Sequence, residues 1–162
     1  MVEEHISVKE MWHRYLMHLG HDPLKPKLKH ASWHFCDNRK DADSLAELVK
    51  QGIKKATTSL LYFYELENEK LPKAGDLSII TNWQGEAQCI IETKKVTLQP
   101  FCEVTEDFAQ IEGEGDKSLQ YWQDVHRHAF TRQMQQYDNE FSEEMLVVCE
   151  EFEMVWHIYD PL

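Results

Sequence analysis

The sequence predicts an α+β fold, a small curved sheet or barrel with helices around it. Two observations favour this class: apolar residues recur at helical spacing near the N-terminus and in residues 117–134, whereas β-branched and aromatic residues dominate the middle of the chain. The chain has 162 residues, 42% of them hydrophobic, which is about one domain's worth. No repeat or flexible linker divides it. We therefore expect a single domain over residues 1–162, with residues 1–32 forming an N-terminal helix and loop packed on the rest.

The first third of the chain is predicted to contain two helices. Apolar spacing predicts a helix from Val8 to about Leu19, which ends at Gly20. Residues 23–38 mix prolines, lysines and aromatics without a period, so we expect a loop with one short extended piece. The second helix ends at Gly52, and its start is capped by one of three residues, Asp41, Asp43 or Ser44.

The middle of the chain is predicted to form three strands, over residues 57–66, 77–83 and 87–98. Gln84-Gly85 lies between the second and third strands and is a hairpin signal. Strands of this kind between helices favour a curved sheet or barrel over a parallel βαβ array.

The last third is predicted to hold a short helix over residues 103–109 and a longer helix over residues 117–134. A final strand follows, because polar positions alternate with four apolar residues, Phe152, Met154, Trp156 and Ile158.

Charge is unevenly distributed. The net charge is −12, yet residues 1–57 carry ten Lys/Arg against eight Asp/Glu, and residues 58–162 carry seven against twenty-one. An acidic surface repels long polyanions, so this pattern favours a small nucleoside- or nucleotide-like ligand over a long strand. No apolar run approaches the roughly 18 residues that span a bilayer, and the acidic N-terminus is unlike a secretory signal. We expect a cytoplasmic protein without membrane contact, whose four scattered cysteines are free thiols.

Four groups of residues, in order along the chain, carry a family resemblance. They are residues 42–59, Leu71-Pro72 with Gly75-Asp76, Pro100-Phe101 with Glu103-Val104, and Glu112-Gly113-Glu114-Gly115-Asp116 with Ser118-Leu119 and Tyr121-Trp122. Together they resemble the ASCH domain family, from about Trp33 to the end of the chain. That family is related to PUA domains. The resemblance implies a PUA-like small mixed β-barrel with helices flanking a cleft, and a function that involves RNA or modified nucleosides.

One branch of this family hydrolyses the acetyl amide of N4-acetylcytidine with a lysine, a threonine three positions on, and a later glutamate. The matching positions here are Lys54, Thr57 and Glu112. In such a site Lys54 takes the hydroxyl proton of Thr57, and Glu112 protonates the leaving nitrogen or orders the attacking water. Residues i and i+3 of a strand point to opposite faces, so Lys54 can meet Thr57 only if residues 52–56 form a turn or bulge.

Substrate contacts are expected beside these three residues. Trp33 and Phe35 lie in the basic, aromatic first third and could stack on a base. The other expected contacts are Asp37, Lys55 and Ser59. Cys36 stands where larger family members tend to have glycine, and Lys55 replaces a commoner threonine, adding a cation beside Lys54 that favours phosphate or lowers the pKa of Lys54.

Two other functions fit the same residues. One is an RNA-binding module that holds single-stranded RNA without catalysis. The other is a ribonuclease in which Glu112, Glu114 and Asp116 bind a divalent metal ion such as Mg²⁺ or Mn²⁺. Amide hydrolysis needs no cofactor, so a chelator separates the two enzymatic functions. The nine histidines, with His126 and His128 among them, are interpreted as structural or surface groups.

Overall fold

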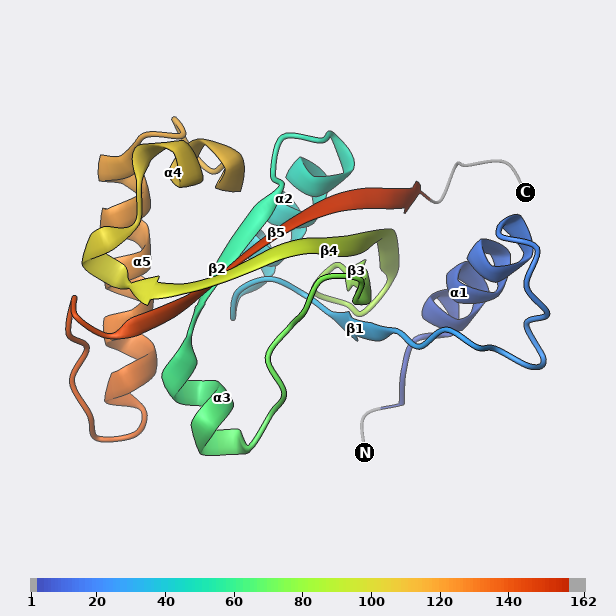
Figure 1. Ribbon diagram of the computed structural model, residues 1–162, viewed down its shortest axis with the longest axis horizontal. Coiled ribbons are helices and arrows are strands. Elements are labelled where there is room, and N and C mark those ends of the chain that lie inside the picture. The colour runs from blue at the N-terminus through green and yellow to red at the C-terminus, as the bar shows by residue number, and fades with distance from the viewer. Residues whose placement is uncertain (1–2, 158–162) are drawn as a thin grey trace.

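A computed structural model describes residues 3–157 of the chain, and its core is one five-stranded sheet in the order β1-β3-β4-β5-β2 (Figure 1). The strands are β1 (Ala31–Trp33), β2 (Ala56–Leu60), β3 (Leu77–Thr81), β4 (Ala87–Pro100) and β5 (Leu146–His157). β1 pairs with β3 in parallel, and the other three pairs are antiparallel. The two long strands β4 and β5 twist together and curl the sheet into a half-barrel. The expected α+β class and curved mixed sheet are confirmed.

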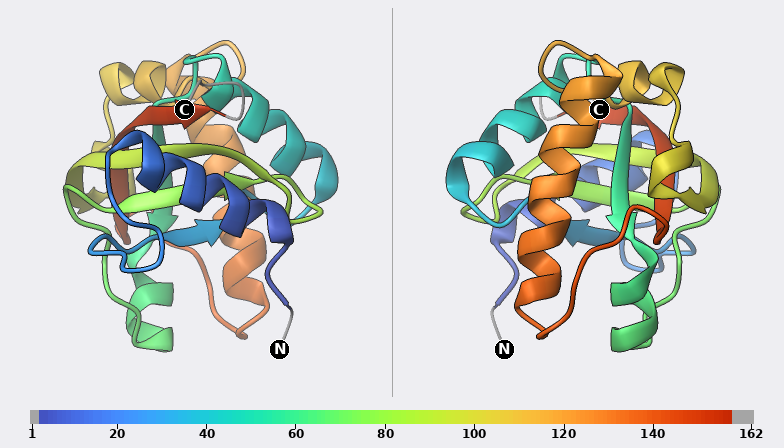
Figure 2. Two further views of the ribbon diagram at one scale, coloured as in Figure 1. Left: turned by 90° about the vertical axis from the view of Figure 1, so that its right-hand side faces the viewer. Right: turned by 90° about the vertical axis from the view of Figure 1, so that its left-hand side faces the viewer.

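Helices cover both ends of the β4–β5 pair. α1 (Ile6–His18) lies at one end, and α4 (Glu106–Glu112) with α5 (Leu119–Gln135) lies at the other (Figure 2). α2 (Arg39–Lys50) precedes β2, and α3 (Leu61–Glu67) follows it. A 3₁₀ turn, η1 (Phe101–Glu103), joins β4 to the loop before α4.

The apolar side chains form three clusters rather than one. The first is made by β2, α4 and α5, with Phe101 and Trp122 stacked at a centroid distance of 5.0 Å. The second holds the apolar face of α1 against Ile79 and Ile90. The third lies under α2 and includes Phe35 and Phe152. The first and third clusters lie on either side of the candidate site described below.

The strand predicted over residues 57–66 is wrong beyond Leu60, because Leu61–Glu67 is helix α3. Asn68 ends that helix in the left-handed conformation, with φ +53°. Tyr62 and Phe63 are only partly buried and pack against the first cluster from the helix. Aromatic side chains favour strands because a strand packs them against a neighbouring surface. Here they pack against the first cluster from a helix equally well.

Several boundaries also differ from expectation. α2 begins at Arg39 and is capped by the Asn38 side chain, which accepts from the Asp41 amide, so none of the three expected residues is the cap. The short helix starts after the cap Thr105 rather than at residue 103. Met154 was expected to face inward but is 37% exposed, because the β4–β5 register shifts between Ile90 and Ile91. Ile158 lies outside the described residues.

Within residues 3–157, no helix is both long enough and apolar enough to cross a membrane. The four cysteines are free thiols, and two of them, Cys89 and Cys149, are buried.

Candidate functional site

The turn after α2, which holds Lys54, and the end of α4, which holds Glu112, are in direct contact. After α2 the chain turns through Gly52, at φ +73°, and the Lys54 amide donates to the Leu48 carbonyl. The Lys55 amide donates to the Ile111 carbonyl, which ties this turn to the end of α4. Gly113 has φ +74°, and a Cβ there would lie 2.2 Å from the Ile53 carbonyl oxygen. Only glycine allows the two segments to approach this closely.

Lys54 is buried at this contact, with 1% of its surface exposed. Its Nζ donates to the Ala56 carbonyl oxygen at 2.6 Å, and lies 3.6 Å from Glu112 Oε2 and 3.9 Å from Glu114 Oε1. The Phe35 ring lies below it, with its centroid 5.0 Å from Nζ. The three donors of the ammonium group thus face three acceptors. Because Ala56 O belongs to the peptide bond before Thr57, the positive charge lies at the start of β2.

Glu112 is the centre of the buried polar group. Its Oε1 accepts from Thr58 Oγ1 at 2.6 Å and from Trp122 Nε1 at 2.8 Å, and its Oε2 faces His126 Nε2 at 3.0 Å in addition to Lys54. Burial acts to raise the pKa of Glu112, but the positive charges of His126 and Lys54 outweigh it and hold that pKa well below the ordinary value. Glu112 is therefore an ionised acceptor rather than a proton donor.

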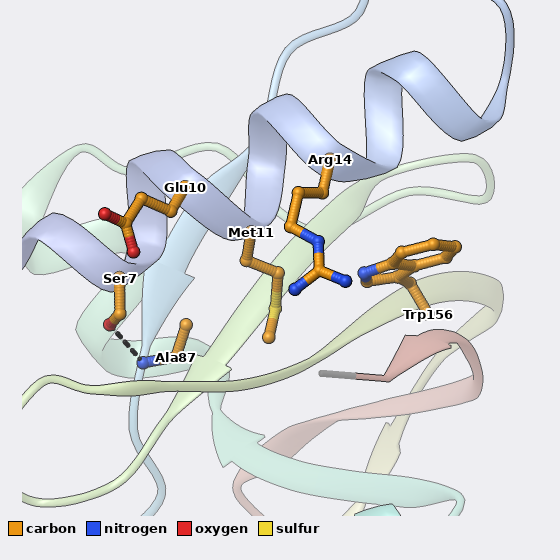
Figure 3. Close-up of a pocket in the computed structure, with 6 residues that line it drawn as sticks. All are labelled: Ser7, Glu10, Met11, Arg14, Ala87 and Trp156. Carbon is orange, nitrogen blue, oxygen red and sulfur yellow. Dashed lines mark hydrogen bonds between the residues drawn. The ribbon is translucent and has the colours of Figure 1, made fainter. Parts of the chain in front are cut away.

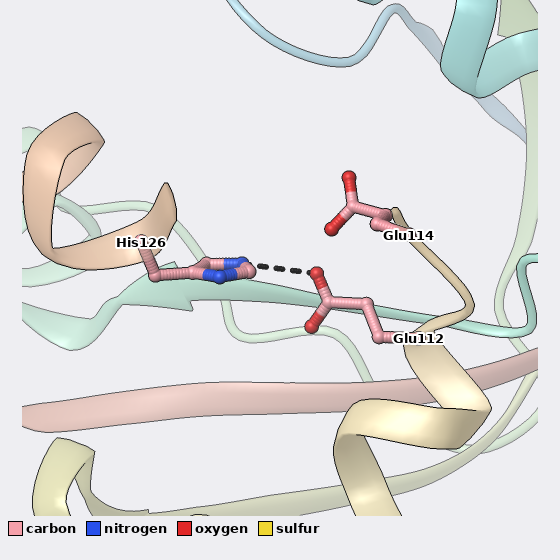
Figure 4. A group of neighbouring side chains, drawn as sticks. All are labelled: Glu112, Glu114 and His126. Atoms are coloured by element: carbon pink, nitrogen blue, oxygen red, sulfur yellow. Dashed lines mark ion pairs between the residues drawn. The ribbon is translucent and has the colours of Figure 1, made fainter. Parts of the chain in front are cut away.

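His126 is the cationic partner of Glu112 (Figure 4). Its Nδ1 lies 2.8 Å from the Trp122 carbonyl oxygen, which can only accept, and its Nε2 faces the Glu112 carboxylate. Both ring nitrogens must carry protons to satisfy these contacts. Burial acts to lower the pKa of His126, yet the Glu112 charge and hydrogen bond raise it above its usual value. The ring also stacks on Trp122, at a centroid distance of 4.3 Å.

Glu114 is the member of this group that reaches the surface. Its side chain is 14% exposed, and Figure 4 shows its carboxylate on the side of the Glu112–His126 pair away from α4. Burial raises its pKa, the nearby Glu112 charge adds to this, and Lys54 opposes it, which leaves a pKa of about 7. At neutral pH Glu114 therefore exchanges a proton readily.

A pocket of about 550 Å³ opens beside Glu114, between α2 and α5. Its walls include Leu45, Leu48, Tyr121, Val125 and Cys36. Small-molecule sites commonly have roughly 300–1,000 Å³, so a nucleoside fits this volume. By comparison, the hollow under α1, where the Arg14 guanidinium lies beside the Trp156 ring, has only about 90 Å³ (Figure 3). The larger pocket is therefore the candidate substrate site.

The structure places the predicted nucleophile on a different face of β2 from the Glu112 group. Thr58 points to Glu112, so Thr57 and Ser59 point to the opposite face. Among the described residues, the Thr57 hydroxyl has no hydrogen-bond partner, whereas Ser59 Oγ lies 3.0 Å from Tyr64 Oη. The turn at residues 52–55 brings Lys54 Nζ to the peptide bond that precedes Thr57.

The other predicted substrate contacts are dispersed. Phe35 is buried under Lys54, and Trp33 meets it edge to face at a centroid distance of 5.0 Å. Phe35 therefore packs against the lysine and is not open to a substrate base. Asp37 pairs with Arg132 at 2.9 Å, and Lys55 is exposed. Cys36 has φ +58°, a conformation that favours glycine, and it lines the pocket. Burial raises the pKa of the Cys36 thiol to about 11.

Glu112, Glu114 and Asp116 were expected as alternative metal ligands, but the structure places Asp116 apart from the other two. Asp116 is exposed and accepts from the Ser118 amide at 2.8 Å. Glu112, Glu114 and His126 instead offer ligand atoms within 4.8 Å of one another. A metal ion does not fit this trio as it stands, because both His126 nitrogens already donate and both Glu112 oxygens already accept.

Sequence reasoning gave no functional role to Thr58, Trp122 or His126. Trp122 and His126 are separated by one helical turn on the buried side of α5, where the apolar stripe gave them a structural role. A signal was nevertheless present, because a histidine and an indole N–H on a buried stripe both need polar partners. Glu112 is the partner that the fold supplies.

Comparisons with known proteins agree with this architecture. The ASCH domain family model matches residues 31–156. An ASCH domain from Lactobacillus crispatus JV V101 has 36% identity and a TM-score of 0.88, over 97% of this chain and 99% of the other. Protein EF3133 from Enterococcus faecalis V583 has 37% identity and a TM-score of 0.82, over 93% and 89%.

A further solved structure, hypothetical protein PH0355, shares the fold at 20% identity, with a TM-score of 0.51 over 78% of this chain and 97% of the other. A comparison with curated proteins gave no match. The family match covers well over half of the chain, and the fold is the one expected from the resemblance. The chain belongs to the ASCH domain family.

Proposed function

We propose that this protein hydrolyses the amide bond of an acylated nucleoside, or of a similar small substrate, that lies across the unpaired edge of β2, with its leaving nitrogen at Glu114 and its acyl carbon at Thr57 on the other face. The observation that carries the proposal is the position of Glu114: a carboxyl group with a pKa of about 7 lies 3.9 Å from the buried Lys54 and borders a pocket of nucleoside size. A group with such a pKa is half protonated at neutral pH, which suits general acid–base catalysis. ASCH proteins are linked to RNA binding or hydrolysis, and the proposal is one specific case.

The reaction divides into two steps. The Thr57 hydroxyl oxygen adds to the acyl carbon, its proton passes to a base, the C–N bond breaks, and the leaving nitrogen takes the proton of Glu114. Water then attacks the Thr57 ester and gives one proton to Glu114, the base returns its proton to the Thr57 oxygen, and the carboxylic acid is released. Thr57 is left as a free hydroxyl and Glu114 is protonated again. The sum is amide plus water giving acid plus amine.

Lys54 acts as a fixed positive charge in this scheme rather than as the base. Its donors already face Ala56 O, Glu112 and Glu114, so no lone pair is directed at Thr57. A preorganised cation at the start of β2 stabilises the negative charge that develops on the tetrahedral intermediate. Glu112 and His126 hold that cation in place, and the leaving-group proton comes from Glu114.

RNA binding without chemistry is a second candidate, favoured by one observation. A hollow of about 380 Å³ beside β1 and β3 is lined by Lys27, Lys29 and His30, and by Lys73, which pairs with Asp76 there. Cations of this kind bind phosphates and make affinity fall as salt rises. This candidate predicts salt-dependent affinity for single-stranded RNA and no turnover.

The test is release of cytidine from N4-acetylcytidine by chelator-treated protein. Thr57→Val and Thr58→Val form a matched pair, because each removes one hydroxyl from adjacent positions of β2 that face opposite ways. The proposal expects turnover by the wild type and by Thr58→Val, and none by Thr57→Val. Wild-type protein that binds RNA but releases no cytidine would favour the second candidate. Activity that the chelator abolishes would point to metal-dependent cleavage instead.

A further inference from the structure

Glu150 is a buried carboxylate directly across from Thr57. β2 and β5 pair antiparallel with Thr57 opposite Glu150, so the two side chains lie on the same face of the sheet. The Cβ atoms of directly opposed residues are about 4.5–5.5 Å apart, which lets a glutamate carboxylate reach a threonine hydroxyl. Glu150 is 7% exposed, and nothing in the reaction described so far uses it.

Both groups have unused hydrogen-bonding capacity. The one side-chain bond of Glu150 to a described residue joins its Oε2 to Thr93 Oγ1 at 3.4 Å, which leaves Oε1 without a protein partner. The Thr57 hydroxyl has none either. Within the described chain, no fully buried side-chain oxygen or nitrogen lacks a partner. Glu150 Oε1 and Thr57 Oγ1 are therefore reached by solvent, as a reacting pair must be.

The first step needs a base for Thr57, and the other candidate groups already have bonding partners or another role in the reaction. Lys54 faces three acceptors, and Glu112 and His126 form a buried ion pair on the other side of β2. Glu114 is required as the acid. We propose that Glu150 is the general base that takes the hydroxyl proton of Thr57. This inference rests on the proposed function.

Glu150 and the groups around it give a proton acceptor of suitable strength. Burial raises the pKa of Glu150, the Thr93 hydrogen bond opposes this, Asp76 raises it further, and Lys54 lowers it. Burial raises the pKa of the nearby Tyr64 phenol, and the Glu150 charge adds to this. The net shift is upward, and a more basic carboxylate accepts a hydroxyl proton better.

In the first step the O–H bond of Thr57 breaks, the proton moves to Glu150, and the oxygen electron pair forms the bond to the acyl carbon. Glu150 then returns that proton to the Thr57 oxygen as the ester bond breaks in the second step.

The test compares Glu150→Gln with Glu151→Gln. The two residues are adjacent on β5, and Glu151 is opposite Ala56 on the other face. Loss of a general base lowers kcat by about 10²-fold or more. We expect that loss for Glu150→Gln, with KM and the thermal transition unchanged, and wild-type kcat for Glu151→Gln. A Glu150→Gln variant with wild-type kcat would overturn the inference and leave the proposed function intact.

A measurement without substrate tests the Glu150–Thr57 pair independently of the proposed hydrolysis. The pKa of Glu150 is followed by carbon-13 NMR in wild type and in Thr57→Val, with Thr58→Val as the control. Thr57→Val replaces a hydroxyl beside the carboxylate with a methyl group, so the added desolvation is expected to raise the pKa of Glu150, while Thr58→Val on the other face leaves it unchanged. If the wild type releases no cytidine, the proposed function fails, and this titration alone decides the Glu150–Thr57 pair. An unchanged pKa in Thr57→Val would overturn it.

Discussion

His126 and Glu112 form a buried ion pair, 3.0 Å from Nε2 to Oε2, with three further donors around the same carboxylate. Removing one partner of such a pair costs about 3–5 kcal/mol, because the other charge stays buried and unpaired. We expect Glu112→Gln to lower the free energy of unfolding by about 3 kcal/mol. Urea denaturation at neutral pH measures it.

Glu106→Gln is the matched control, because Glu106 is in the first turn of the same helix and exposed. Its loss costs under about 1 kcal/mol through the helix dipole. Equal losses for the two variants would contradict the central position given to Glu112. The lowered pKa of Glu112 also means that its contribution is complete above the ordinary carboxyl pKa of 4.5 and is lost as the pH falls through the lower folded value.

Gly113 allows the site to assemble, and Gly52 supplies a control. Both have positive φ, +74° and +73°, but a Cβ meets the Ile53 carbonyl only at Gly113. We expect Gly52→Ala to cost about 1–2 kcal/mol from backbone strain alone. Gly113→Ala is expected to cost about 1–3 kcal/mol more, because the loop must also move away from residue 53. Thermal or urea unfolding compares them, and similar losses would show that the close contact is unimportant.

The raised pKa of Glu114 makes folding stability depend on pH. Between the ordinary value of 4.5 and about 7, the folded state binds a proton that the unfolded state has lost. The Glu114 contribution is therefore full below 4.5 and is lost as the pH rises through 7. We expect Glu114→Gln to remove this part of the pH dependence, as measured by urea unfolding across the range. Asp116→Asn, two residues along and exposed, should keep it.

Glu114 also determines how the rate of hydrolysis depends on pH. The acid form of Glu114 is required, so kcat is expected to fall as the pH rises above about 7. Glu114→Gln should lower kcat by about 10²–10⁴-fold and abolish this limb of the profile. A variant that keeps the limb would assign the titration to another residue.

Metal ions are expected to have no effect on the Glu112, Glu114 and His126 trio. Coordination would require His126 to lose a proton and the nearby Lys54 cation to move. We expect the thermal transition to be the same with millimolar Mg²⁺, with Mn²⁺ and with chelator. A Tm that rises with Mn²⁺ in the wild type but not in His126→Asn would contradict the protonation states assigned here.

The sequence predicted those parts of the fold that depend on local periodicity. The helices α1 and α5 follow the apolar 3.6-residue spacing, and the β3–β4 hairpin follows Gln84-Gly85. Residues 61–67 were misread because their aromatic side chains suit a strand but pack from a helix. Local pattern does not distinguish those two ways of covering the same apolar surface.

The site was predictable in its segments but not in its contacts. The resemblance placed Lys54, Thr57 and Glu112 in one site; Lys54 and Glu112 lie 3.6 Å apart, whereas Thr57 faces the other side of β2. Which of two adjacent threonines faces Glu112 depends on where β2 begins after the turn, and a shift of one residue reverses it. The charge of His126 and the pKa of Glu114 arise from burial beside residues brought together by tertiary structure, which spacing along the chain does not reveal.

The most direct test is to locate the acyl group during turnover. Protein mixed with excess N4-acetylcytidine is quenched in acid, and mass spectrometry of the intact chain and its peptides follows. The proposed mechanism predicts one acetyl group on the peptide that contains Thr57 and no acetyl group on that peptide in Thr57→Val. In Glu150→Gln the acetyl group is expected to form more slowly than in the wild type. Cytidine release without any acylated peptide, or with acetyl on Thr58, would contradict Thr57 as the nucleophile.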